Sequence, residues 1–175
     1  KERALARRLG VRRFVDGWLQ TYGAGVQRRL GSSDQVGMVL RYGVGTTEYM
    51  RSTGGYALTL ECGQHADPAA PDVAYRAIMN TLAFLGFIDA PQPEPIADAD
   101  MEALNMVVVH DKLHASDRFI KTWSSFDKVK QGEQIGVRAD GTPVTAEFDA
   151  YILFPDVNAQ ANAEWYYLAR VASSF

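Results

Sequence analysis

A proline-rich segment in the middle of the chain, Ala90-Pro91-Gln92-Pro93-Glu94-Pro95, limits what this sequence can fold into. Proline has no N–H group, so alternate positions of this segment cannot donate hydrogen bonds to a helix or to a central strand. The polar residues that follow, Asp98 and Asp100, extend it into a linker. We therefore predict a domain boundary near residue 95, which divides the chain into domains at 1–95 and 96–175.

The first half alternates strand and helix patterns, which is typical of an α/β domain. Strand candidates lie at 11–15 and 56–61, and a short helix is expected at 2–9. Residues 17–30 are ambiguous because Gly23 and Gly25 interrupt a helical pattern. Residues 36–42 could be strand or loop, and Thr46 or Thr47 could cap a short helix that ends near Arg51.

The clearest helix pattern covers residues 71–85, between Pro71 and the stop signal Gly86. Four apolar residues recur there at helical spacing: Ala74, Ile78, Leu82 and Leu85.

The second half is β-rich. Six short strand candidates lie at 105–110, 119–123, 134–138, 143–147, 151–154 and 165–170, and turn signals such as Asp140-Gly141 separate them. This order predicts a small all-β barrel or sandwich domain. The fold class expected for the whole chain is α/β, as part of a larger domain, followed by that β domain.

Composition and charge exclude several classes of partner. The 175 residues are 47% hydrophobic with a formal net charge of -3. Eight Arg or Lys residues gather in the first 30, but no aromatic pattern accompanies them, so we interpret them as a solvated helix face and expect no nucleic-acid partner. The sequence contains no apolar run of about 18 residues, so we predict no membrane span. Cys62 is the single cysteine, which excludes an intrachain disulfide and fits the cytoplasm.

The N-terminal residues KERALARRLG contain neither an initiator methionine nor the apolar core of a signal peptide. We therefore expect this chain to be a piece of a longer protein.

Chemistry-bearing side chains follow the strand candidate at 56–61 in the order Glu61, Cys62, Gly63, Gln64 and His65. By pattern alone, Glu61 is interpreted as a strand-end carboxylate that caps the next helix or faces water. His65 could line a pocket or cap that helix. Cys62 alternates with Glu61 along the strand, so it should face the opposite side and be a small buried residue.

The sequence predicts no metal ligands within this chain. It has three histidines, His65, His110 and His114, and no His-x-x-Glu motif. His110 and His114 would share one face of a helix, but the preceding residues read as strand and a third ligand is not evident. Zinc sites normally use three or four protein ligands.

Two stretches, LTLECGQHADPAAPDVAYRAIMNTLAFLGFI and GEQIGVRADGTPVTAEFDAYILFPDVNAQANAEWYYLA, resemble the succinylglutamate desuccinylase/aspartoacylase family. These are zinc-dependent amidohydrolases with a carboxypeptidase-like α/β domain and a C-terminal β domain. The resemblance implies that Glu61 is the general acid/base and that the substrate is a small N-acyl amino acid or a related compound. The zinc ligands would lie upstream of this chain, which alone would then be inactive.

The same resemblance implies roles in substrate binding for Arg51, His65 and Tyr151. Arg51 lies ten residues before Glu61, where the family has an arginine that binds a substrate carboxylate. Some members have a tyrosine before a proline where this chain has Phe154 and Pro155, so the hydroxyl of Tyr151 could take that place. This departure puts the substrate in doubt more than the reaction.

Two alternatives remain open. The first is a non-catalytic binding or interaction module in which Glu61 is vestigial. The second is a lipoyl-type carrier domain, which is disfavoured because the hairpin tip Ala139-Asp140-Gly141 contains no lysine. An oligomer is compatible with the sequence, although we expect the aromatics at 165–167 to form a core rather than an interface.

Overall fold

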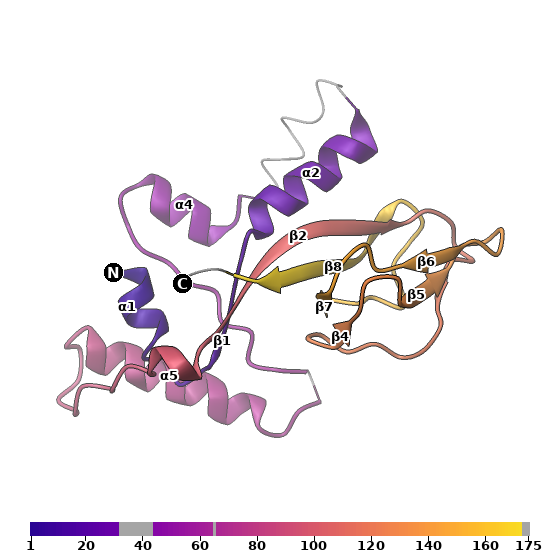
Figure 1. Ribbon diagram of the computed structural model, residues 1–175. Helices are drawn as coiled ribbons and strands as arrows, with labels where there is room; N and C mark the ends of the chain where they lie inside the picture. The colour runs from indigo at the N-terminus through magenta and orange to yellow at the C-terminus, as the bar shows by residue number, and fades with distance from the viewer. Residues whose placement is uncertain (32–43, 65, 173–175) are drawn as a thin grey trace. The chain divides into compact units, whose positions relative to one another are not determined.

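The computed structural model describes residues 1–31, 44–64 and 66–172 (Figure 1). These residues fall into two compact units, one formed by 1–14 with 44–102 and the other by 15–31 with 103–172. The two consecutive domains predicted to meet near residue 95 stay a prediction.

The first unit consists mainly of helices. They are α1 (Glu2–Ala6), α4 (Thr46–Ser52), α5 (Ala70–Phe84) and the 3-10 turn η1 (Asp98–Asp100). Thr46 or Thr47 was expected to cap helix α4, but the cap is Gly45 and the helix begins at Thr46. The Gly45 N–H donates a hydrogen bond to the Glu48 carboxylate at 3.1 Å.

Helix α5 confirms the helix predicted at 71–85. Pro71 stands at its first turn, and Gly86 follows its end with a φ of 74°, a conformation that glycine adopts without strain. The exposed fractions of Ile78 and Leu85 are nevertheless 57% and 53%, whereas the small residues Ala77 and Ala83 are buried. The described part of the chain therefore leaves much of the predicted apolar stripe in contact with solvent.

The strand predicted at 56–61 is not formed. These residues have no regular secondary structure, and no backbone–backbone hydrogen bond joins 58–61 to another described residue. A strand exists only as part of a ladder, so the local preference of Tyr, Leu and Thr for extended backbone is not sufficient.

Residues 17–30, which the sequence left ambiguous, form helix α2 (Trp18–Leu30) after the short strand β1 (Arg13–Asp16). A Cβ atom added at Gly25 would lie 2.7 Å from Cγ1 of Val109, so glycine permits this close approach. Thr21 Oγ1 donates a hydrogen bond to the Met106 carbonyl at 3.1 Å. The glycines that obscured the helical pattern thus include one that packing requires.

The strands of the second half are β2 (Glu102–Lys112), β3 (Arg118–Phe119), β4 (Lys128–Val129), β5 (Gln134–Val137), β6 (Pro143–Thr145), β7 (Ala150–Leu153) and β8 (Ala163–Val171). They form a five-stranded sheet in the order β1-β2-β8-β7-β4 and a three-stranded sheet in the order β3-β5-β6. Neither sheet closes on itself within the described ranges, so the architecture is mixed α/β and does not establish the predicted barrel or sandwich.

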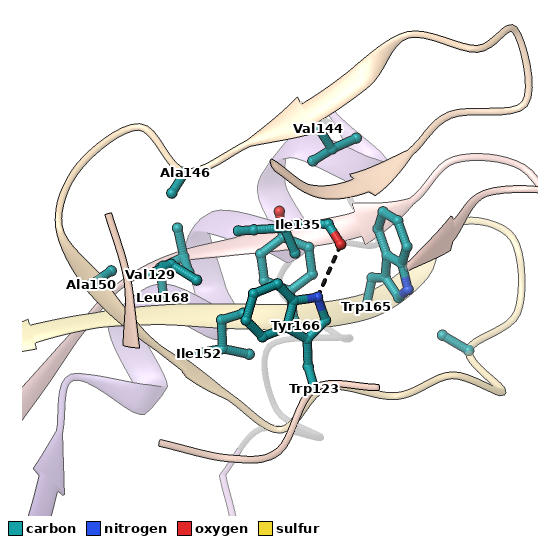
Figure 2. Close-up of a cluster of buried hydrophobic side chains, with 11 residues drawn as sticks. Trp123, Val129, Ile135, Val144, Ala146, Ala150, Ile152, Trp165, Tyr166 and Leu168 are labelled. Atoms are coloured by element: carbon teal, nitrogen blue, oxygen red, sulfur yellow. Dashed lines mark hydrogen bonds between the residues drawn. The ribbon is translucent and has the colours of Figure 1, made fainter. Parts of the chain in front are cut away.

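Large aromatic and aliphatic side chains form the core between these strands (Figure 2). Trp165 and Tyr166 of β8 are 1% and 0% exposed, and Trp123 Nε1 donates a hydrogen bond to the Ile135 carbonyl at 3.0 Å. This bond satisfies the indole N–H inside an otherwise apolar cluster. The expectation that the aromatics at 165–167 serve a core is confirmed.

Among the helices that the structure describes, none has both the length and the apolar character needed to cross a membrane.

Candidate functional site

Glu61 lies in the extended segment between α4 and α5, and its side chain is exposed. Its carboxylate makes no hydrogen bond or ion pair with any other described residue. The helix-capping role considered for it is not observed, because the N-cap of α5 is Ala69 and no described side chain caps the helix; the Asp67 carboxylate accepts the N–H of Ala69 at 2.9 Å. Among the described residues, Glu61 is therefore a carboxylate without a partner, and its exposed side chain could accept a proton or bind a donor.

Arg51, on α4, has each of its three guanidinium nitrogens next to a protein oxygen. Its Nε lies 2.8 Å from the Glu2 carboxylate, one terminal nitrogen donates to the Ala57 carbonyl at 2.9 Å, and the other is 3.6 Å from Glu48. Glu2 also accepts the Ala57 N–H at 2.8 Å. Arg51 thus fixes the segment that leads to Glu61 at a point four residues before it.

This contact changes the titration of Glu2. The hydrogen bond from Arg51, aided by the Ala57 N–H, keeps the pKa of the Glu2 carboxyl below its usual value. A substrate carboxylate that used Arg51 would have to replace or share these protein partners.

Tyr151 lies on β7, in the other compact unit from Glu61 and Arg51. It is half-buried against a cluster that includes Leu153 and Tyr167, and Lys128 Nζ lies 5.4 Å from its ring centroid. Phe154 is 47% exposed and has a φ of 48°. His65 lies outside the described residues.

The described residues do not fit a zinc site. They contain no group of three or more His, Cys, Asp or Glu side chains placed to bind a metal ion. His110 is on strand β2, as predicted, and stacks on Tyr166 with 4.7 Å between ring centroids. His114 accepts the Ser116 N–H through Nδ1 at 3.1 Å, and Cys62 is half-buried.

Sequence reasoning missed a buried carboxylate in the second unit. Asp111, whose side chain is 5% exposed, lies 2.7 Å from Arg28 and 2.6 Å from Arg29 of α2. These two arginines were interpreted as part of a solvated face. That interpretation is wrong for Arg29, whose side chain is 19% exposed, whereas Arg28 remains 49% exposed although it is paired. No local pattern signals the contact, because Asp111 is more than 80 residues away in the sequence.

Among the comparisons with known proteins, only the comparison with solved structures finds similar proteins. No family model and no curated protein matches the sequence. A succinylglutamate desuccinylase/aspartoacylase from Rhodobacter sphaeroides matches 98% of this chain with a TM-score of 0.62 at 15% identity. The succinylglutamate desuccinylase from Vibrio cholerae matches 98% with a TM-score of 0.60 at 17% identity. The Vibrio parahaemolyticus enzyme matches 73% with a TM-score of 0.54 at 16% identity.

This chain shares its fold with the desuccinylase/aspartoacylase structures. The resemblance seen in the sequence is therefore confirmed by the tertiary structure. The chain spans 38%, 45% and 49% of the length of the Vibrio parahaemolyticus, Vibrio cholerae and Rhodobacter sphaeroides structures. At such low sequence identity the likeness concerns the fold, and the activity has to be argued from the site.

Proposed function

We propose that this chain forms part of a hydrolase that cleaves the amide or ester bond of a small N-acyl amino acid or a related compound. The observation on which this rests is the exposed carboxylate of Glu61, which has no partner within the described ranges and lies in an anchored segment. The shared fold supports it, because the similar structures bear the names desuccinylase and aspartoacylase.

In this proposal Glu61 moves the proton. It takes a proton from the water that attacks the acyl carbon, and it delivers that proton to the departing amine as the C–N bond breaks. One C–O bond forms and one C–N bond breaks, so the overall reaction is a hydrolysis. A carboxylate that bonds to none of the residues the structure describes suits this role, because no hydrogen bond to them has to be broken before it accepts the proton.

Zinc enters the proposal only as an ion bound by residues outside the described ranges. When bound, zinc polarises water or a carbonyl group. No step here is assigned to it, since the described residues provide no set of ligands.

Substrate recognition is assigned to Arg51, with Tyr151 and His65 as further candidates. A guanidinium group binds a carboxylate through two parallel N–H groups. Arg51 would exchange Glu2 or Glu48, its present partners, for a substrate carboxylate.

Zinc analysis and hydrolysis of a panel of N-acyl amino acids test this proposal. We expect the 175-residue chain alone to be inactive, and the chain extended by a segment that contains the zinc ligands to hydrolyse a member of the panel. In the extended protein, Glu61→Gln should lower turnover by about 10²–10⁴-fold with zinc content unchanged. Glu94→Gln is a matched control, because Glu94 is exposed and has no partner among the described residues.

The second candidate is a non-catalytic binding module on the same fold. The engagement of Arg51 by Glu2 and Ala57 favours it, because an arginine so engaged resembles a structural residue. An extended protein that contains zinc but hydrolyses no member of the panel would favour this candidate. Normal turnover in Glu61→Gln would instead contradict the role of Glu61 as the group that moves the proton.

A further inference from the structure

We propose that Arg7, Arg8 and Arg12 form a binding pocket for an oxyanion, a phosphate or carboxylate group. These arginines line a pocket of about 420 Å³ in the first compact unit, together with Asn80 and residues 93–96. The sequence suggested a solvated helix face for these charges. The structure instead brings three of them to one concave surface.

The local fold explains why they meet. Helix α1 ends at Ala6, so Arg7 and Arg8 follow directly, and Gly10 then reverses the chain with a φ of 86°. This turn returns Arg12 to the same pocket. A Cβ atom at Gly10 would lie 2.9 Å from Cδ of Arg76, so glycine is needed for the conformation and for the space.

The opposite wall is the proline-rich segment. The Ile96 N–H donates to the Arg7 carbonyl at 2.8 Å, and an Arg7 terminal nitrogen donates to the Ile96 carbonyl at 3.0 Å. Pro93 and Pro95 have no N–H to offer a ligand. The Asn80 amide nitrogen is already engaged with the Arg8 carbonyl at 2.6 Å. The donors available to a ligand are therefore mainly guanidinium groups.

These guanidinium groups have unused donors. Arg7 Nε is buried and has no hydrogen-bond partner among the described residues. Arg8 donates to the Ala4 carbonyl at 2.7 Å and lies 5.2 Å from the Phe84 ring centroid, but it pairs with no described carboxylate. Arg12 is 75% exposed, and its distance of 4.0 Å from Asp100 makes this a weak surface ion pair. Because Arg7 Nε is shielded from solvent, an oxyanion in the pocket would accept its hydrogen bonds chiefly from Arg8 and Arg12, beside the positive charge of Arg7.

Glu94 is the opposing charge in the lining, and Asp98 pairs with Arg7 at 2.5 Å. The Asp98 side chain is 83% exposed, so it neutralises Arg7 from the solvent side. Glu94 should weaken anion binding by like-charge repulsion. Its replacement should therefore tighten binding, whereas replacement of an arginine should weaken it. The pocket does not depend on the hydrolase proposal, since none of its residues is assigned to that reaction.

Titration with inorganic phosphate and, separately, with malonate tests the pocket, by calorimetry or by amide chemical shifts in low-salt buffer. We expect saturable binding, reduced about tenfold by Arg8→Gln and by Arg12→Gln, as for the loss of a charge-assisted hydrogen bond. Glu94→Gln should tighten binding. Arg118→Gln is the matched control, because Arg118 lies on β3 in the other unit. Tighter binding of phosphate would identify a phosphate group as the ligand, and tighter binding of malonate a carboxylate; each supports the proposal.

Two results would overturn the proposal. One is a wild-type chain that binds neither anion saturably. The other is an Arg12→Gln protein with an unchanged melting temperature that binds both anions as tightly as Arg118→Gln does. If Arg8→Gln does not fold, Arg12→Gln still tests the proposal, because the exposed side chain of Arg12 contributes little to packing.

Discussion

The Asp117 carboxylate, which is 1% exposed, lies 2.7 Å from the guanidinium group of Arg138. It also accepts the backbone N–H groups of Leu113, His114 and Ala139 at 2.9, 3.2 and 2.9 Å. One buried side chain therefore joins the loop after β2 to the loop after β5. A buried charge of this kind is tolerated because four hydrogen-bond donors, one of them charged, surround it.

We expect Asp117→Asn to destabilise the second unit by about 1–3 kcal/mol. The amide lacks the negative charge that attracts Arg138. Its NH₂ group would also take the place of one carboxylate oxygen and so face an N–H donor. Urea denaturation followed by tryptophan fluorescence measures the change. Asp140→Asn, in an exposed turn, is the control. Equal stability of the two variants would show that the buried network contributes nothing.

Asp117 also predicts a loss of stability in acid. Burial alone raises the pKa of this carboxyl, but hydrogen bonds from Arg138 and the backbone outweigh it and lower the pKa below its usual value. A carboxyl with a lowered pKa in the folded state adds stability above its unfolded pKa of about 3.9, and that stability is lost as pH falls through the folded value. The unfolding free energy of wild type should fall below about pH 4 more steeply than that of Asp117→Asn.

His110 acts at a higher pH. Burial lowers its pKa, with Arg138 and Arg28 adding to the effect, although Glu147 at 3.4 Å opposes it. The unfolded chain therefore binds the proton more readily, and stability is lost as pH falls below about 6.5 towards the lowered folded value. His110→Gln should remove this part of the pH dependence. Unfolding curves at pH 7.5 and 5.5 for both proteins measure it, and an equal change in both would contradict the prediction.

Gly25→Ala should destabilise the chain by about 1–3 kcal/mol, although alanine favours helix more than glycine does. The reason is the 2.7 Å distance between the added Cβ and Cγ1 of Val109. A double-mutant cycle with Val109→Ala tests this cause, because removing Cγ1 makes room for the new methyl group. The cost of Gly25→Ala should fall in the Val109→Ala background, and an unchanged cost would point to another reason.

Arg51→Gln separates two roles for this arginine. If it binds a substrate carboxylate, KM in the extended, active protein should rise about tenfold or more, with a smaller effect on kcat. If it only anchors the backbone at Ala57, Glu2→Gln should cause the same kinetic change, since Glu2 shares that anchor. Melting temperatures of both variants control for loss of folding.

Local signals determined which elements form where the chain's own spacing is enough. Helix α5 follows from an apolar repeat between Pro71 and Gly86, and the strands of the second half follow from short apolar runs between turns. Glu61 could also be identified from local sequence as a candidate catalytic residue, because its neighbours in the sequence carry the family resemblance.

Contacts between distant residues were decided only by the tertiary structure. The strand pattern at 56–61 forms no ladder, because pairing depends on another segment and none of the described segments pairs with it. Helix α2 tolerates its glycines because Val109 lies against Gly25, and the charges of Arg28 and Arg29 are neutralised by Asp111. A sequence shows which side chains are apolar or charged. Which of them meet depends on packing across many residues, and that packing determines whether a charge is solvated, paired or available to a ligand.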